Sequence, residues 1–193
     1  IGGAVAIALI VLFAKFGGTV VQQSFAERCR ARWYLLNAVV IHFMMDGLVG
    51  AFHVNKPFAK QYGMLDSRYA AAWGSDGSAA VDCVSLMEMV VHAPLCVAVY
   101  VLYNRGHAAR DVVEIVACAV QFIGTVAYLG LELWKGKAES AFDIDADLTF
   151  TVHYVLYFWA QLFMFAMYLV IPAVLAGQAA RRVIAAYPAA KRE

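Results

Sequence analysis

The chain has 193 residues, of which 63% are hydrophobic and 15% are charged, and its mean hydropathy is +0.68. Soluble domains usually carry about 25% charged residues, so this composition excludes an ordinary soluble domain and indicates an integral membrane protein. The formal net charge of +1 gives no basic surface for nucleic acid, and no nucleic-acid partner is expected. Because the chain begins at Ile1 rather than Met, we expect a further segment ahead of it.

Five apolar stretches follow one another, each long enough to cross a hydrocarbon layer of about 30 Å as a helix. They cover residues 1–20, 33–54, 79–103, 111–134 and 148–177. Helices are expected because isolated strands would leave backbone polar groups unsatisfied in lipid. The sequence therefore predicts one all-α integral membrane domain over residues 1–193, a bundle of five transmembrane helices with the two termini on opposite faces.

Basic residues are divided unevenly between the two membrane faces that five spans would define. One face would have ten: Lys15, Arg28, Arg30, Arg32, Arg105, Arg110, Arg181, Arg182, Lys191 and Arg192. The other would have five: Lys56, Lys60, Arg68, Lys135 and Lys137. By the positive-inside rule, this asymmetry predicts that the carboxyl terminus faces the cytosol, or the matrix in a mitochondrial membrane.

Two of the predicted helices carry an acid and an imidazole four residues apart. The pairs are His42 with Asp46 and Glu88 with His92, and residues at this spacing share one helix face. Ionisable groups at membrane depth are costly and usually face a cavity or a partner. One interpretation is that each pair only satisfies itself and stabilises helix packing. The alternative is a polar surface within an apolar cavity, where the groups donate and accept protons.

Aromatic residues are dense, with ten Tyr, twelve Phe and four Trp. The fifth stretch alone has Tyr154, Tyr157, Phe158, Trp159, Phe163, Phe165 and Tyr168. Most are expected to pack between helices or anchor the chain at the membrane interface. The alternative is a ring-lined pocket for a flat apolar ligand, in which the ring faces stabilise a carbocation.

Other residues with distinctive chemistry are expected to have structural roles. Asp82 and Glu114 lie near span ends and are predicted to be interfacial, and Pro94 and Pro172 are predicted to kink their helices. The cysteines have no metal-ligand spacing, so they are interpreted as buried small apolar residues, and no metal site is expected. They are Cys29, Cys83, Cys96 and Cys118.

Short segments in a fixed order also point to a family. They are Ile41-His42 through Asp46-Gly47, Asp66-Ser67-Arg68-Tyr69, Met87-Glu88, Pro94-Leu95, Gln121, Gly124, Tyr128, Tyr157-Phe158-Trp159 and Leu169 through Pro172. Their order and spacing resemble the emopamil-binding protein family of EXPERA-domain membrane proteins, over residues 33–176. That family includes the sterol Δ8-Δ7 isomerase and the sigma-2 receptor.

The resemblance implies a five-helix bundle around an intramembrane cavity that takes a sterol or another flat apolar lipid from the membrane. In the isomerase an acid protonates a ring double bond, aromatic rings stabilise the cation, and a base removes a neighbouring proton. Matching positions assign the proton transfers to His42, Asp46 and Glu88. Ligand contacts are expected from His92, Tyr128, Tyr157, Trp159 and Tyr168. An isomerase of this kind needs no cofactor and is expected in the endoplasmic reticulum.

The chain departs from the family pattern at several of these positions. The family has glutamate where this chain has Asp46, which shortens the side chain by one methylene. By the same resemblance, Val91 replaces a threonine, Phe165 an asparagine, and Tyr168 and His92 replace tryptophans. Two polar groups of the cluster are thus lost. The sigma-2 branch of the family suggests an alternative, a non-catalytic protein that binds a sterol or another flat lipid. A third alternative is an accessory subunit bound to other membrane subunits of a large complex, such as a respiratory complex of the mitochondrial inner membrane.

The loop after the second stretch contains Asp66 and Arg68. They are expected to order this loop as a lid over one membrane face, with the guanidinium clamped on a carboxylate or on backbone carbonyls. The alternative is a solvated charge on the loop.

Overall fold

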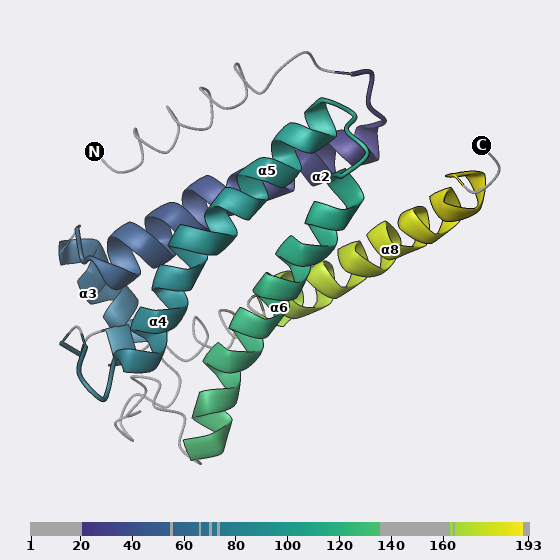
Figure 1. Cartoon of the computed structure of the whole chain (residues 1–193). Coiled ribbons are helices and arrows are strands. Elements are labelled where there is room, and N and C mark those ends of the chain that lie inside the picture. The colour runs from purple at the N-terminus through teal and green to yellow at the C-terminus, as the bar shows by residue number, and fades with distance from the viewer. Residues whose placement is uncertain are drawn as a thin grey trace.

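The computed structural model describes residues 21–54, 56–65, 67–69, 71–72, 74–135, 163 and 165–190, and all regular structure in these ranges is helical (Figure 1). The α-helices are α2 (Phe25–Leu36), α3 (Lys56–Leu65), α4 (Ala79–Met87), α5 (Ala93–Asn104), α6 (Arg110–Lys135) and α8 (Ile171–Ala190). Three π-helical stretches continue directly into neighbouring helices: η1 (Asn37–Ala51), η3 (Glu88–His92) and η5 (Ala166–Val170). A short 3₁₀ turn, η2 (Ser67–Tyr69), follows α3.

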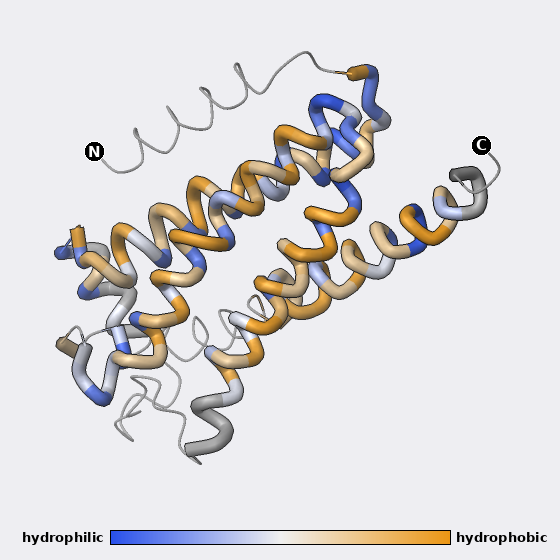
Figure 2. Tube along the Cα trace, in the orientation of Figure 1, coloured by the Kyte–Doolittle hydropathy of each residue, from blue (hydrophilic) through white to orange (hydrophobic). Residues whose placement is uncertain are grey.

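Four helical rods within the described residues are long and apolar enough to cross a membrane. They are Phe25–Ala51, Ala79–Asn104, Arg110–Gly130 and Ala166–Tyr187. Hydrophilic residues gather at the turn between α5 and α6 and around α3, while the rods between them are mostly hydrophobic (Figure 2). The first predicted span, residues 1–20, lies outside the described residues. The prediction of five spans, and of termini on opposite faces, is therefore not confirmed.

Two predicted helix ends are wrong, and arginines explain both errors. The second stretch was predicted to begin at residue 33, but α2 begins at Phe25, where Ser24 and Glu27 form a reciprocal capping box. The last stretch was predicted to end at residue 177, but α8 continues to Ala190. Arginine side chains near both ends find partners inside the bundle, so the charges do not end the helices.

The prolines at positions 94 and 172 each lie just after a π-helical turn. The backbone N–H of Ala93 bonds to the carbonyl of Glu88, and that of Ile171 bonds to the carbonyl of Ala166, both five residues back. Proline cannot donate to the carbonyl four residues back, and its ring crowds that carbonyl. A wider turn relieves this crowding, so the helices continue through the prolines instead of ending there.

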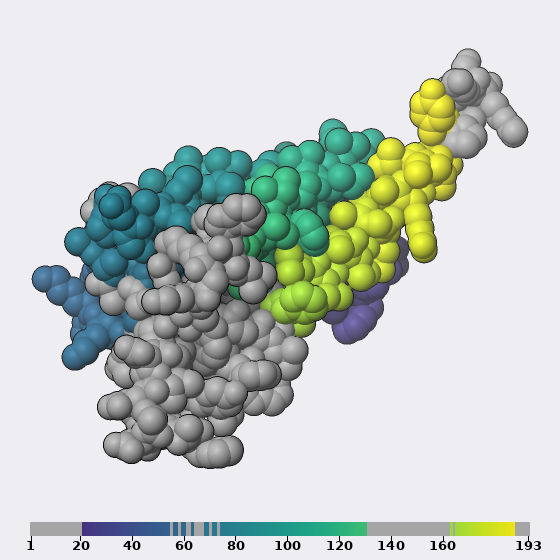
Figure 3. Space-filling model, turned by 90° about the horizontal axis from the view of Figure 1, so that it is seen from below, coloured from purple at the N-terminus to yellow at the C-terminus, as the bar shows by residue number. Residues whose placement is uncertain are grey.

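The core lies between α2, α5 and α6, where α2 and α5 run side by side (Figure 1). Its members are Ala31, Tyr34, Leu35, Ala38, Val39, Cys96, Val99, Tyr100, Tyr103, Ala117 and Cys118. The helix α8 packs against α6 and forms an outer edge of the described bundle (Figure 3). Apolar side chains such as Ile123 and Ile184 are exposed on these rods, as expected where the surrounding solvent is lipid.

Candidate functional site

Two carboxylates and two imidazoles meet in the interior, between the rod that contains η1 and the rod that contains η3. His42 Nδ1 lies 3.2 Å from Asp46 Oδ2 and 3.0 Å from Glu88 Oε2. His92 Nδ1 lies 2.6 Å from the same Glu88 oxygen. The two rings are 4.2 Å apart at their centroids and tilted by 43°. The four residues that sequence spacing paired within each helix therefore form one cluster across two helices, and we call them the acid–imidazole cluster.

π-Helical geometry positions this cluster, because His42 and Asp46 belong to η1 and Glu88 and His92 are the two ends of η3. A π turn widens the helix locally and changes the direction in which the following side chains point. Both imidazoles and Glu88 are almost completely buried, and the side chain of Asp46 is 16% exposed. Burial at this depth removes competing water, so hydrogen bonds within the cluster are stronger than they would be at a surface.

An open pocket of 180 Å³ adjoins one side of the cluster. His42, Asp46 and Glu88 contribute its polar wall. The remaining lining is mostly apolar and aromatic: Ile41, Met45, Tyr69, Val84, Ser85, Gln121, Gly124, Thr125, Tyr128, Phe163 and Tyr168. The rings of Phe163 and Tyr168 meet edge to face, with centroids 6.3 Å apart. The pocket thus offers two carboxyl groups and one imidazole to a largely apolar ligand.

The predicted ligand-contact residues have different positions relative to this pocket. Tyr128 and Tyr168 line it. His92 does not line it, because the ring lies behind Glu88 and bonds to that carboxylate. Tyr157 and Trp159 lie outside the described residues.

Sequence reasoning missed Ser85, one turn before Glu88 on the same helical face. The side chain is buried, its Oγ has no hydrogen-bond partner among the described residues, and it lines the pocket. The three-residue spacing to Glu88 was the signal that could have identified it.

Two of the positions at which the chain is expected to differ from the family pattern lie away from the carboxylates. Val91 is 45% exposed and Phe165 is 52% exposed, and neither lines the pocket. The expectation that both side chains replace polar groups of the family's cluster stays a prediction, and in this structure neither side chain lies at the pocket. The π turn through η3 explains the case of Val91, because it aligns Glu88 with His92 and leaves Val91 facing outward.

Arg68 in η2 is buried rather than solvated. Its guanidinium donates to the backbone carbonyl of Tyr128 at 3.2 Å and stacks over the Tyr128 ring, 4.2 Å from the centroid. The alternative of a solvated loop charge is therefore wrong, and the expected clamp on a backbone carbonyl is observed. Asp66 lies outside the described residues. Through Tyr128, Arg68 connects the short turn η2 to the wall of the pocket.

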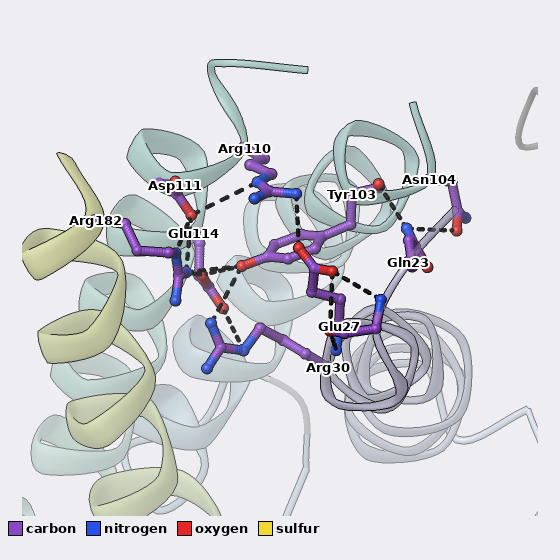
Figure 4. Close-up of polar contacts among 10 residues, drawn as sticks. Gln23, Glu27, Arg30, Tyr103, Asn104, Arg110, Asp111, Glu114 and Arg182 are labelled. Atoms are coloured by element: carbon purple, nitrogen blue, oxygen red, sulfur yellow. Dashed lines mark hydrogen bonds and ion pairs between the residues drawn. The ribbon is translucent and has the colours of Figure 1, made fainter. Parts of the chain in front are cut away.

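A second polar network lies at the other end of the bundle, around Glu114 of α6 (Figure 4). The Glu114 carboxylate accepts hydrogen bonds from Tyr34 at 3.1 Å, Tyr103 at 2.7 Å and Arg182 at 2.7 Å. Arg30 approaches the same carboxylate at 3.6 Å. The expectation that Glu114 is interfacial concerns its depth in the membrane and stays a prediction; within the protein the side chain is completely buried. It joins α2, α5, α6 and α8 in one ionic contact.

Further ion pairs surround this network. Arg182 also bonds to Asp111 at 2.8 Å, and Arg110 pairs with Glu27 at 3.0 Å (Figure 4). Positive and negative side chains are thus paired where the helices converge. None of these groups borders the pocket at the acid–imidazole cluster, so we assign the network to stability.

The cysteines only partly follow the prediction of burial. Cys96 and Cys118 are buried, but Cys29 and Cys83 are exposed. Cys96 Sγ lies 3.5 Å from His92 Nε2, on the side of that ring opposite Glu88.

These features define a class: a helical protein of the membrane with a buried acid–imidazole cluster beside an apolar pocket. Comparison with known families gives the family. The model described as EXPERA (EXPanded EBP superfamily) matches residues 58–179, more than half of the chain. The chain therefore belongs to the EXPERA family, and it is an integral membrane protein. The match includes Glu88, while His42 and Asp46 lie before it. None of the curated proteins matches the chain.

Proposed function

We propose that the protein is an isomerase that moves a carbon–carbon double bond in the rings of a sterol, by adding one proton and removing another. The proposal rests on one observation. Two carboxyl groups, Asp46 and Glu88, contact the same nitrogen of His42 at the wall of an apolar pocket. Two carboxyl groups joined by an imidazole supply an acid, a base and a path between them.

The reaction would proceed in two proton transfers. One protonated carboxyl group gives its proton to a carbon of the double bond, and the electron pair of that bond forms the new C–H bond. The cation left on the adjacent ring carbon is then neutralised when the ionised carboxylate removes a proton from the next carbon. The electrons of that C–H bond form the new double bond. His42 Nδ1 returns the proton from the second carboxyl group to the first, so no cofactor is consumed.

The surroundings support a short-lived cation. Tyr168, Tyr128 and Phe163 line the pocket, and ring faces attract a positive charge. The mostly apolar lining gives water few groups to bind, which favours proton loss over addition of water to the cation. The volume of 180 Å³ is smaller than the roughly 300–1,000 Å³ of most small-molecule pockets. We therefore propose that only the reacting rings enter this space and that the rest of the sterol extends from it.

Membership of the EXPERA family is consistent with this chemistry. The endoplasmic reticulum is the expected location for a sterol isomerase. A lipid-binding protein without catalysis, and an accessory subunit in another membrane such as the mitochondrial inner membrane, are the outcomes against which the proposal is tested.

The test is conversion of a Δ8 sterol by the full chain in lipid nanodiscs, followed by gas chromatography and mass spectrometry. Wild type should form the Δ7 product. Glu88→Gln should lower the rate by about 100-fold or more, because glutamine keeps the shape but cannot exchange a proton. Sterol binding by this variant should change little. Glu27→Gln, which changes an acid far from the pocket, is the matched control and should convert normally. Binding without conversion by wild type would contradict the proposal.

A further inference from the structure

The side of the acid–imidazole cluster that faces away from the pocket has a second set of converging groups. His42, His92 and Cys96 each offer one donor atom there, and these three atoms lie within 4.8 Å of one another. All three side chains are almost completely buried, with 1% of each residue exposed. The three residues come from two helical rods, η1 on one side and η3 with α5 on the other.

The carboxylates on the pocket side determine which nitrogen of each ring is free. His42 Nδ1 is held by Asp46 and Glu88, and His92 Nδ1 is held by Glu88. Each ring therefore directs Nε2 away from the carboxylates, and His92 Nε2 points to Cys96 Sγ at 3.5 Å. Metal-bound histidines have this arrangement, with one nitrogen on the metal and the other donating to a carboxylate.

Two buried polar atoms near this set have no partner among the described residues. One is His42 Nε2 and the other is Asn37 Oδ1. Asn37 lines a cavity of 10 Å³ together with His92 and Cys96. A buried polar atom without a partner is costly, and a bound ion or an ordered water is a common explanation. A metal ion between the two rings would satisfy His42 Nε2, and a water ligand in this cavity would offer a partner to Asn37 Oδ1.

We propose that His42 Nε2, His92 Nε2 and Cys96 Sγ bind a zinc ion, with a water molecule in the small cavity as the fourth ligand. Zinc takes four ligands in a tetrahedron, with Zn–N distances of about 2.0–2.1 Å and Zn–S distances of about 2.3 Å. Donor atoms around zinc are then roughly 3.5 Å apart, so side-chain rotations that move the donor atoms by about an ångström would complete the site. Two imidazoles and one thiolate are ligands that zinc prefers.

Charge balance at membrane depth also favours a divalent ion. The two positive charges of zinc are matched by the Cys96 thiolate and by the Glu88 carboxylate that bonds to both imidazoles. A site that is neutral as a whole can be buried at a much lower cost than an isolated charge. Zinc on Nε2 would leave the proton of His42 on Nδ1, between Asp46 and Glu88. The zinc site does not depend on the proposed isomerase activity.

The test uses the full chain, purified in detergent with a tag that contains no histidines. Mass spectrometry of the dissolved metals should find one zinc ion per chain. After chelation, added cobalt should give a thiolate-to-cobalt charge-transfer band in the near ultraviolet and the intense visible bands of a tetrahedral site. Zinc should also raise the thermal unfolding midpoint of the stripped protein. No substrate is needed, so this result is independent of whether sterol is converted.

Cys96→Ser should reduce zinc to background and abolish the charge-transfer band. Cys83→Ser, which changes an exposed cysteine, is the matched control and should retain both. If Cys96→Ser does not yield folded protein, His92→Gln tests the same site, and it should weaken zinc binding and shift the visible cobalt bands. The proposal is overturned if wild type binds no zinc, if it binds copper in its place, or if Cys96→Ser binds zinc as wild type does.

Discussion

Gly124 of α6 lies directly against Glu88: a β-carbon at position 124 would be 2.7 Å from Glu88 Oε1 and 2.9 Å from Met87 Cε. No side chain fits between them, so this glycine allows α6 to close over the acid–imidazole cluster. Gly124→Ala should therefore push the Glu88 carboxylate away from its present position. A displacement of about 1 Å can cost roughly 100-fold in rate, and we expect a loss of sterol conversion of that order.

Gly130→Ala is the matched control for this change. A β-carbon at position 130, on the same helix, would meet nothing within 4 Å. This substitution should leave conversion unchanged and stabilise the helix slightly, because alanine has a higher helix propensity than glycine. Conversion rates and thermal unfolding of the two variants, measured side by side, separate the displaced carboxylate from a general effect on α6. Normal conversion by Gly124→Ala would argue against a catalytic role for Glu88.

Lengthening Asp46 should maintain or increase conversion. Asp46→Glu adds one methylene, the pocket beside it is open, and the resemblance to the family places a glutamate here. The longer carboxyl group should reach further into the pocket toward the reacting carbon. Asp46→Asn, which has nearly the same size but cannot exchange a proton, should lose conversion by about 100-fold or more. Equal rates for Asp46→Asn and wild type would exclude Asp46 from the reaction.

Removing the charge of Glu114 should destabilise the bundle. Glu114→Gln leaves Arg30 and Arg182 without their shared buried carboxylate, and breaking a buried ionic contact typically costs about 3–5 kcal/mol. Arg182 keeps Asp111 as a partner, so we expect a loss of about 3 kcal/mol in the free energy of unfolding, at the small end of this range. The loss should be measured as a decrease in the midpoint of thermal unfolding in detergent.

The control for that substitution is Glu27→Gln. It changes a partly exposed pair with Arg110, and glutamine also fits the capping box at the start of α2. Its cost should be about 1 kcal/mol or less. If the two variants lose the same stability, Glu114 does not act as a buried link between the four helices.

Arg68→Ala should weaken sterol binding more than it lowers the maximal rate. The substitution removes the guanidinium that stacks on Tyr128 and bonds to its carbonyl, so that wall of the pocket loses its support. We therefore expect a higher KM with little change in kcat. Lys60→Ala, an exposed position on the neighbouring α3, should change neither constant. A normal KM for Arg68→Ala would show that the pocket wall is independent of η2.

The sequence was sufficient to predict the helical class and the general positions of the described spans. Composition alone distinguishes lipid from water as the solvent, and apolar length then defines each span. The ends are harder to predict, because apolar length alone does not show where a helix that carries arginines begins or ends. Arg30 and Arg182 extend back to Glu114, and these partners lie on different helices far apart in the sequence.

The acid–imidazole pairs could also be predicted, because a spacing of four residues defines one helix face. The contact between His42 and Glu88 could not, since it depends on how two rods pack. The position of Cys96 could also have been predicted from the spacing of four residues within one helix. It lies four residues after His92, on the same stripe as Glu88, and spacings between cysteines alone do not reveal this relation. The π turns have no simple sequence pattern, and they explain why Val91 faces outward.

Solvent deuterium incorporation tests the central claim most directly. The full chain in nanodiscs is incubated with a Δ8 sterol in D₂O, and the product is analysed by mass spectrometry. The side chain of Asp46 is 16% exposed, so the carboxyl groups can exchange their protons with solvent between turnovers. The Δ7 product should then carry one deuterium, at the ring carbon that was protonated. Glu88→Gln should give neither product nor labelled substrate while still binding sterol. Unchanged, unlabelled sterol with the wild-type protein would contradict the account, and so would equal labelling by wild type and Glu88→Gln.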